Sequence, residues 1–300
     1  MTQHIARRGM KSSDGLWAAL FLAPNFLCFF AFTIVPVVWA AAMSFTEWKI
    51  IGSPTWIGLG NYIEIFTKDE VFWQVLKNTL IFMVVNVPVG VVLSLLVAML
   101  LNQDIAFKRI YRGFFFMPVI TSTVLCSIVW KWLLIPDFGL VNYILSLFGI
   151  RGPSWLTDTR FALPSIIAVN IWKSLGFNML LFIAGLQNIP DVYYEAFKMD
   201  SQNSLQRTIH ITIPLLSPTT FFVFTMAVIN SFQVFDTVMM MTGGGPGRAT
   251  SVLVHYLYQN AFKYFRMGYA SALAYILFFM VLIITIIQFR LNNQKDFSLS

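Results

Sequence analysis

The chain has 300 residues, of which 58% are hydrophobic and only 11% are charged. Soluble domains contain about 45–50% apolar and about 25% charged residues, so this composition excludes a water-soluble globular domain and indicates a polytopic membrane protein. The net charge of +7 does not indicate nucleic-acid binding, because the basic residues lie mostly beside apolar runs, where they favour the inner face of a membrane.

Six apolar stretches are long enough to cross a membrane. A bilayer core about 30 Å thick requires about 20 apolar residues in a helix, and backbone groups in lipid must form their hydrogen bonds internally. The alternating segments of about ten residues that build a membrane β-barrel are absent from the sequence. We therefore predict an all-α integral membrane protein whose six transmembrane helices lie at roughly 16–43, 72–101, 112–134, 161–187, 215–241 and 268–290.

The first span resembles a signal peptide in one respect, because the run Ala40-Ala41-Ala42 near its end could serve a signal peptidase. However, the apolar region of a signal peptide has about 7–15 residues, and this one is nearly twice as long. We therefore expect an uncleaved membrane anchor. Proline removes a backbone donor, so Pro24 and Pro36 are expected to kink this span.

Lys and Arg residues are more frequent in one set of connections than in the other. They are densest at Lys108, Arg109 and Arg112, near the start of the third span. Positively charged connections remain in the cytoplasm, so we predict that both termini are cytoplasmic. In this topology residues 1–15 form the cytoplasmic N-terminus, 16–290 the six-span domain and 291–300 a cytoplasmic tail.

The cytoplasmic loop at 188–214, between the fourth and fifth spans, has a helix–turn–helix pattern. Pro190 suits the first turn of a helix, and Asp191 and Glu195 favour its positive N-terminal end. We predict a helix from about 190 to 200, a turn over 201–204, and a second helix that begins near Leu205 and is disturbed at Pro214. By itself this pattern is typical of an amphipathic connector.

The spacing within this loop resembles the EAA motif of ABC importer permeases, which reads Glu-Ala-Ala, three residues, Gly, nine residues, Ile-x-Leu-Pro. This chain has Glu195-Ala196-Phe197, then Ser201, then Ile211-Thr212-Ile213-Pro214 at the same spacing. Phe197, Ser201 and Ile213 replace an alanine, the glycine and the leucine. Serine adopts a left-handed turn less readily than glycine, so the turn at Ser201 is expected to differ from that of the family.

Further segments resemble the carbohydrate-type permeases of this superfamily, and together they extend from the first span to the last. They are 57–62, 184–190, 235–237, 242–246 and 267–270. The chain is therefore similar to a permease subunit of a carbohydrate ABC importer, a multi-pass protein of the bacterial cell membrane. Because the sequence has no ATP-binding motif, the resemblance implies a transport subunit and not an enzyme.

The resemblance also implies partners and a mechanism. A second, homologous permease, an ATPase dimer that binds ATP and Mg, and an extracytoplasmic solute-binding protein would move a sugar or oligosaccharide by alternating access, while this chain, surrounded by membrane lipid, needs no cofactor. The loop would be a coupling helix in a cleft of the ATPase, where Ala196 allows close approach and Glu195 offers a charge. The implied coupling residues are Glu195, Ala196, Phe197, Asp200, Ser201, Ile211 and Pro214.

Polar residues within the fourth and fifth spans are candidates for a sugar path, because polar groups inside a membrane are costly. At helical spacing Asn170 and Lys173 are predicted to share a face of the fourth span, and Asn230, Gln233 and Thr237 a face of the fifth, with Asp236 beside it. The ring of Trp172 is one on which a sugar can stack. The alternatives are hydrogen bonds between helices, or neutralisation of Lys173 by Asp236. The substrate-path candidates are Asn170, Trp172 and Lys173 in the fourth span and Asn230, Gln233, Asp236 and Thr237 in the fifth.

Other functions have weaker support in the sequence. The run Gly243–Gly247 lacks the Gly-Lys-Ser/Thr of a P-loop and is expected to be a flexible or tightly turned outer loop. An ion-coupled secondary transporter is the alternative function, but the spans contain few carboxylates, mainly Asp236, and no inverted repeat with paired broken helices. The HExxH and GxSxG motifs are absent, which disfavours a membrane enzyme.

Overall fold

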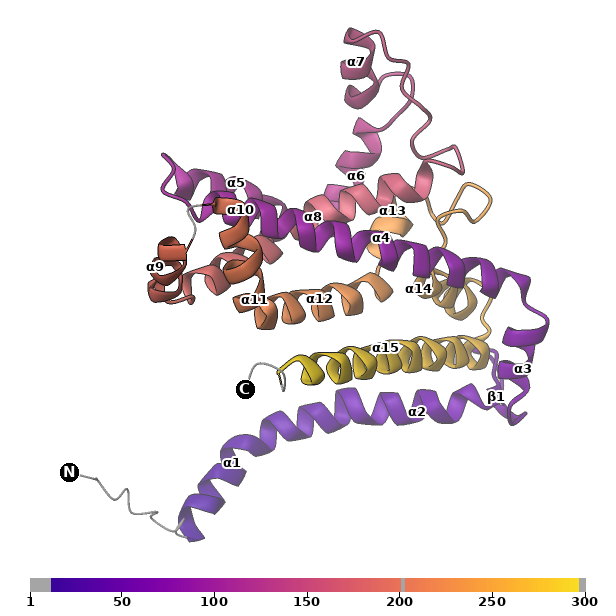
Figure 1. Cartoon of the computed structure of the whole chain (residues 1–300). Helices are drawn as coiled ribbons and strands as arrows, with labels where there is room; N and C mark the ends of the chain where they lie inside the picture. Colours follow the sequence, from indigo (N-terminus) through magenta and orange to yellow (C-terminus); the bar gives the residue numbers. More distant parts are fainter. Residues whose placement is uncertain (1–11, 201–202, 297–300) are drawn as a thin grey trace.

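A computed structural model describes residues 12–200 and 203–296. Four of the described helices are long and apolar enough to cross a membrane: Ala19–Ser44, Glu70–Leu101, Ala162–Gln187 and Met267–Asn292. Two bent pairs also qualify if each pair is one span: Lys108–Ile120 with Thr123–Leu133, and Ser204–Leu215 with Ser217–Phe232. The described chain is therefore a mainly helical membrane protein with four to six candidate spans (Figure 1), which confirms the predicted fold class at that level.

The first span is a curved helical run whose second half packs on the bundle and whose first half lies apart from it. It consists of α1 (Ser12–Phe29), the π-helical turn η1 (Phe30–Ile34) and α2 (Val35–Ser44). α2 packs along α15 (Met267–Asp296), where the Tyr275 hydroxyl donates to the Val37 carbonyl at 2.6 Å, whereas α1 curves away from α15 (Figure 1).

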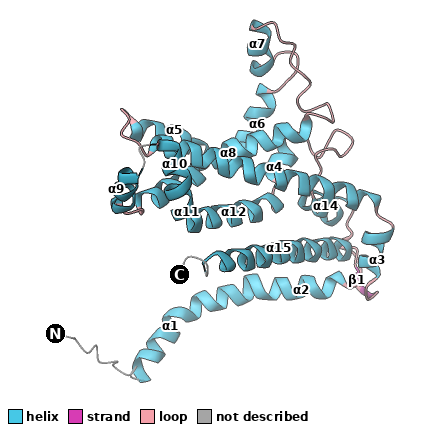
Figure 2. Ribbon diagram, in the orientation of Figure 1, coloured by secondary structure: helices cyan, strands magenta, loops and turns pink. Residues whose placement is uncertain are grey.

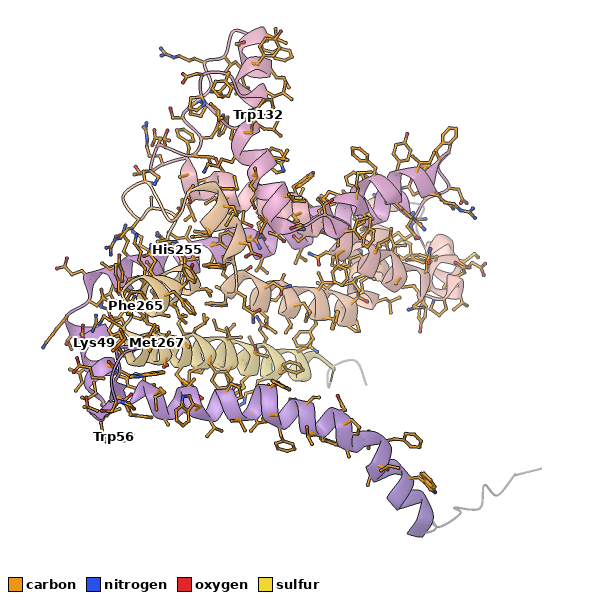
Figure 3. All side chains as sticks on the ribbon, turned by 180° about the vertical axis from the view of Figure 1, so that it is seen from behind. Lys49, Trp56, Trp132, His255, Phe265 and Met267 are labelled. Atoms are coloured by element: carbon orange, nitrogen blue, oxygen red, sulfur yellow. The ribbon has the colours of Figure 1, made fainter. Side chains whose placement is uncertain are left out.

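The short elements gather at one end of the bundle, called here the α14 end. Asn61 of α3 donates its amide to the carbonyls of Ser44 and Thr46 at 2.8 and 2.9 Å, and the Met267 amide donates to the Trp48 carbonyl at 2.9 Å. Lys49 and Met267 accordingly lie near each other in Figure 3, and the only strands of the described chain lie at this end in Figure 2. The elements are the antiparallel β1 (Thr46–Glu47) and β2 (Thr55–Trp56), α3 (Gly60–Thr67), α14 (Leu253–Tyr258) and η3 (Gln259–Lys263).

The core is formed by α4 (Glu70–Leu101) and α8 (Ala162–Gln187), which pack along each other, and by α12 (Ser217–Phe232), which packs against α4. Buried apolar side chains fill this contact, and the Asn86 amide of α4 donates to the Ser231 hydroxyl of α12 at 3.0 Å. Close packing and interhelical hydrogen bonds of this kind hold membrane helices together.

The third predicted span, 112–134, is wrong as a continuous helix. Its two parts, α5 (Lys108–Ile120) and α6 (Thr123–Leu133), meet at 100°. The bend occurs because Thr121 and Ser122 have ψ angles of 140° and 135°, which belong to extended backbone. α6 leads into α7 (Leu140–Leu147), which projects from the bundle (Figure 1).

The fifth predicted span, 215–241, is also wrong in its bounds. The helical run begins at Ser204, bends by 68° beside Leu216, and ends at Phe232. Gln233 is the C-cap of α12 and has a non-helical backbone conformation. A separate short helix, α13, follows at Asp236–Met241. The run before the bend consists of α10 (Ser204–Arg207), η2 (Thr208–Thr212) and α11 (Ile213–Leu215).

Candidate functional site

The loop after α8 folds into a short helix, α9 (Asp191–Asp200), at the end of the bundle opposite the α14 end (Figure 1). This confirms the helix predicted at about 190–200. Asp191 lies in its first turn, where a carboxylate is stabilised by the helix dipole. Glu195 and Ala196 are exposed and Phe197 is half-buried, while Val192 and Met199 present 63% and 88% of their surface. α9 therefore offers an open, mostly apolar face that carries one central carboxylate.

The opposite face of α9 is anchored to the bundle. Tyr194 packs against the core that includes Ile189, and its hydroxyl lies 3.4 Å from the Thr212 hydroxyl. The Arg207 guanidinium stands 5.9 Å from the centre of the Tyr194 ring, within the range of a cation–π contact. These contacts connect α9 to the helical run that begins at Ser204.

The second helix of the loop begins at Ser204, close to the predicted Leu205. Asn203 caps it, since its side-chain oxygen accepts from the amides of Leu205 and Gln206 at 2.9 and 3.4 Å. Ile211 is half-buried, and Pro214 lies in α11, just before the bend at Leu216. Among the predicted coupling residues, Ser201 and the side chain of Asp200 lie outside the described residues.

Lys173 of α8 forms hydrogen bonds at the break between α5 and α6. This break is called here the elbow. The ammonium group of Lys173 donates to the carbonyls of Pro118 and Thr121 at 3.1 and 2.8 Å. The Pro118 carbonyl belongs to the last turn of α5, which a helix leaves without internal partners, and Thr121 is the extended residue that follows the helix. Within residues 12–200 and 203–296, no ion pair joins Lys173 to Asp236, so the lysine supports the elbow and does not neutralise that carboxylate.

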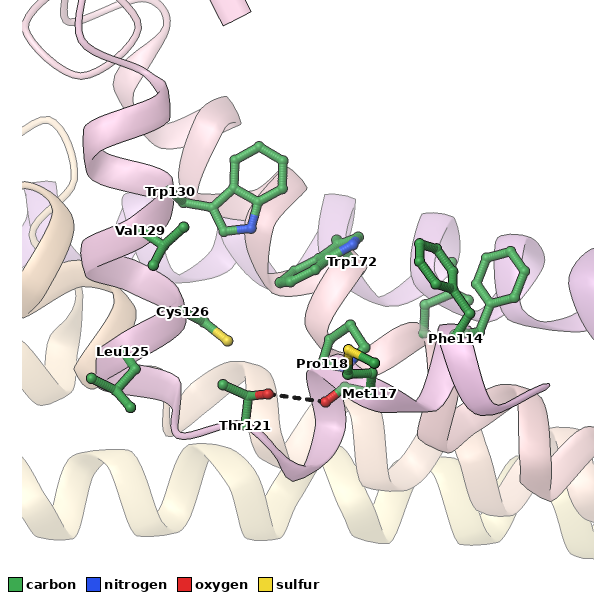
Figure 4. Close-up of a pocket in the computed structure, with 11 residues that line it drawn as sticks. Phe114, Met117, Pro118, Thr121, Leu125, Cys126, Val129, Trp130 and Trp172 are labelled. Atoms are coloured by element: carbon green, nitrogen blue, oxygen red, sulfur yellow. Dashed lines mark hydrogen bonds between the residues drawn. The ribbon is translucent and has the colours of Figure 1, made fainter. Parts of the chain in front are cut away.

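Trp172 lines a pocket of about 420 Å³ in the angle of the elbow (Figure 4). The indole of Trp130 stands edge-on to it, with ring centres 5.4 Å apart. The lining is almost wholly apolar, and the Thr121 hydroxyl donates to the Met117 carbonyl at 3.0 Å. The pocket is lined by Phe114, Phe115, Met117, Pro118, Thr121, Leu125, Cys126, Val129, Trp130, Trp172 and Leu175.

The polar candidates of the fifth span lie at the second break, between α12 and α13. Because α12 ends at Phe232, the predicted shared face of Asn230, Gln233 and Thr237 is wrong. Asn230, Gln233 and Asp236 are exposed around the break, whereas Thr237 is buried. Asn170 of α8 is half-buried. α13 packs against α6, so both breaks adjoin the same helix.

A hydrogen-bonded carboxylate at the α14 end was not predicted. Asp69 caps α4 by accepting from the amides of Val71 and Phe72 at 2.9 and 3.1 Å, and its second oxygen accepts from the hydroxyls of Tyr256, at 2.7 Å, and Tyr269. Burial, followed by the bond to Asp69, raises the pKa of Tyr256 to about 12. An Asp directly before an apolar run is the sequence signal of such a cap.

The glycine-rich segment at 242–247 is a tightly turned loop, one of the two predicted forms. The Thr250 hydroxyl donates to the Gly245 carbonyl at 2.7 Å and lies 2.7 Å from the Thr242 hydroxyl. Gly244 lies against the buried ring of His255, where a Cβ would overlap the imidazole. Burial, together with the charge of Lys263, lowers the pKa of His255, so the imidazole favours its neutral form.

Comparisons with known proteins identify a family and relatives that this chain resembles over nearly its whole length. Residues 15–295 match the family model described as "Binding-protein-dependent transport system inner membrane component". The chain is 36% identical to the probable ABC transporter permease protein YesP of Bacillus subtilis (93% of this chain, 91% of that protein). It is 35% identical to the lactose transport system permease protein LacF of Rhizobium radiobacter (92% and 94%) and 31% identical to the arabinooligosaccharides permease protein AraP of B. subtilis (92% and 88%).

The fold is also that of a solved transporter. A chain from the crystal structure of a bacterial ABC transporter involved in the import of the acidic polysaccharide alginate superposes with a TM-score of 0.83 at 24% identity, covering 94% of this chain and 96% of that one.

Proposed function

Because this chain belongs to the family of binding-protein-dependent transport system inner membrane components, we propose that it is the permease subunit of an ATP-driven importer for a sugar or oligosaccharide. The observation that carries the proposal is its identity of more than 30%, over more than nine-tenths of its length, with permeases named for lactose and arabinooligosaccharides. Those names state the solutes of the relatives. The membrane setting follows from the family and from the apolar helices.

The proposed topology has six spans, with α9 and both termini in the cytoplasm and the α14 end outside. In this topology each bent pair counts as one span, and the Lys and Arg of 108–112 lie inside, as positively charged connections do. α9 is the proposed coupling helix. Its exposed face, centred on Glu195 and Ala196, docks in a cleft of the ATPase, while Tyr194 and Arg207 connect it to the fifth span.

The ATP-driven cycle requires subunits that this chain does not supply. The sequence contains no P-loop, so ATP and Mg are bound by a partner ATPase dimer. A second, homologous permease completes the path through the membrane, and a solute-binding protein delivers the sugar at the α14 end. Closure of the ATPases moves α9 and opens the path outward, and hydrolysis with product release restores the inward-facing state.

The substrate path is proposed to pass the two breaks in the spans. Irregular backbone at membrane depth is tolerated where it is buried in protein or lines a water-filled cavity. The elbow with Trp172 and the break with Asn230, Gln233 and Asp236 both adjoin α6. Lys173 supports the elbow by donating to its carbonyls, and the other two candidates are the half-buried Asn170 on α8 and the buried Thr237 on α13.

The test is uptake by the complete complex in proteoliposomes. The permease pair, ATPase and binding protein are reconstituted, and uptake of radiolabelled lactose, arabinotriose and maltotriose is measured with and without ATP inside the vesicles. The proposal predicts that at least one sugar accumulates, and only with ATP and the binding protein. Uptake that needs no ATPase subunit and collapses with an uncoupler would identify an ion-coupled transporter.

A further inference from the structure

The helix α5 begins at the end of the bundle where α9 lies (Figure 1). Residues 107–111, at its start, are called here the α5 collar. Arg109 is exposed, and Phe107, Ile110 and Tyr111 present 71%, 66% and 48% of their surface. Because α5 is the first half of a candidate span, the proposed topology puts the α5 collar where that span enters the membrane from the cytoplasm.

The α5 collar carries positive charge that the described chain does not balance. Between the end of α4 and the end of α5 there are three cations, Lys108, Arg109 and Arg112, but only one carboxylate, Asp104. The Asp104 carboxylate lies 2.9 Å from the Lys108 ammonium group, and no ion pair among the described residues includes either arginine. Arg112 instead donates to the Leu101 carbonyl at 2.9 Å. Within the described chain, Arg109 is therefore the cation that stays free at this surface.

The apolar side chains of the α5 collar are exposed at some cost. The backbone of Phe107 is left-handed, with a φ angle of 61°, and this region is unfavourable for a bulky residue. A ring with 71% of its surface exposed gains little packing within the chain in return. Ile110 and Tyr111 are exposed beside it. Apolar and aromatic side chains at the membrane boundary are stabilised when lipid covers them.

A free cation beside three exposed apolar side chains matches the chemistry of an anionic phospholipid. A guanidinium group donates to phosphate oxygens in a bidentate geometry, and the acyl chains of the same lipid can cover the apolar side chains. Inorganic phosphate would satisfy only the cation. Anionic lipids of the cytoplasmic leaflet attract Lys and Arg residues that lie next to a span, which is the position of this surface.

We propose that the α5 collar is a docking surface for an anionic phospholipid of the inner leaflet. Arg109 binds the phosphate, and the acyl chains pack on Phe107, Ile110 and Tyr111. Asp104 weakens the preference for an anionic lipid, because it pairs with Lys108. The inference rests on the topology given under the proposed function and is independent of which sugar is transported.

The test identifies the occupant directly, by a photo-crosslinker in place of Tyr111. The complete complex with Tyr111→benzoylphenylalanine is placed in nanodiscs that contain a minor fraction of phosphatidylglycerol in phosphatidylcholine. After irradiation, the crosslinked molecules are identified by mass spectrometry. Phosphatidylglycerol should be crosslinked about fivefold more often than its share of the lipid, the factor expected for one cation near an anionic headgroup. The control is the same probe at Val84, an exposed residue in the middle of α4, which should sample both lipids in proportion.

Two variants change the charge of the surface in opposite directions. Arg109→Gln removes the free cation and should abolish the enrichment of phosphatidylglycerol. Asp104→Asn releases Lys108 from its ion pair and should raise the enrichment further, by up to about fivefold. Both residues are exposed, so neither substitution removes a buried contact.

Several results would overturn the inference. Crosslinking to the ATPase or to the second permease in place of lipid would assign the α5 collar to that subunit. Equal sampling of the two lipids, or an enrichment that Arg109→Gln leaves unchanged, would exclude the headgroup contact. An enrichment that inorganic phosphate abolishes would indicate a site for a free anion.

Failure of the proposed topology or function would be seen separately. Labelling of Arg109→Cys by a membrane-impermeant maleimide added outside intact cells, with no labelling of the wild-type chain, would refute the topology. Absence of sugar uptake in the proteoliposomes would refute the proposed function and would leave the lipid measurement as it stands.

Discussion

Replacing Asp69 with alanine is expected to destabilise the α14 end of the bundle. The carboxylate accepts four hydrogen bonds, two from backbone amides of α4 and two from the hydroxyls of Tyr256 and Tyr269. Loss of a helix N-cap costs about 1 kcal/mol, and a hydrogen bond to a charged group contributes about 1.5–3 kcal/mol. Since bonds to one acceptor are not additive, we expect the free energy of unfolding to fall by about 3–5 kcal/mol.

The assay is unfolding of the purified complex in nanodiscs, followed by tryptophan fluorescence. Glu70→Ala is the matched control, because Glu70 is the next residue, is exposed, and contributes only to the first-turn charge of α4. Tyr256→Phe alone should cost about 1.5–3 kcal/mol, but little when added to Asp69→Ala, since its partner is then gone. An Asp69→Ala variant as stable as Glu70→Ala, or a fully additive double variant, would refute this reasoning.

Three further outcomes are expected. Glu195→Lys should reduce ATP-driven uptake at least tenfold while ATP hydrolysis and membrane insertion persist, and normal uptake would remove Glu195 from the coupling contact. Lys173→Met should lower the free energy of unfolding by about 2 kcal/mol, because the Pro118 and Thr121 carbonyls lose their donor; wild-type stability would contradict this role. Burial keeps the pKa of His255 below 6.5 in the folded state, so stability is fully present above pH 6.5 and declines as pH falls from there through the folded pKa. His255→Gln should weaken that decline in unfolding measured from pH 8 to 5, and an unchanged pH profile would exclude His255 as its cause.

Local patterns predicted the segments whose structure is decided locally. α9 and the second helix of the loop follow from Pro190, Asp191 and the cap residues near 203, and the α9 prediction agrees to within about a residue. Apolar length predicted the four unbroken candidate spans, of which α4 and α8 agree with the expected bounds to within about two residues.

The two breaks were not predictable in the same way. Thr121 and Ser122 interrupt an apolar run, and neither residue is a glycine or a proline. The elbow that they form is held by Lys173, which lies more than 50 residues further along the chain. The role of Lys173 therefore depends on a tertiary contact that a local pattern does not contain. Similarly, the predicted polar face of Asn230, Gln233 and Thr237 assumed an unbroken helix, whereas α12 ends at Phe232.

The most direct test of the central claim is the composition of the complex in native membranes. The tagged chain is purified in several mild detergents, and the proteins that remain bound are identified by mass spectrometry. The account predicts an ATPase with a P-loop together with a second, homologous permease, and predicts that Glu195→Lys weakens retention of the ATPase but not of the permease. A chain that purifies alone in every detergent would contradict it.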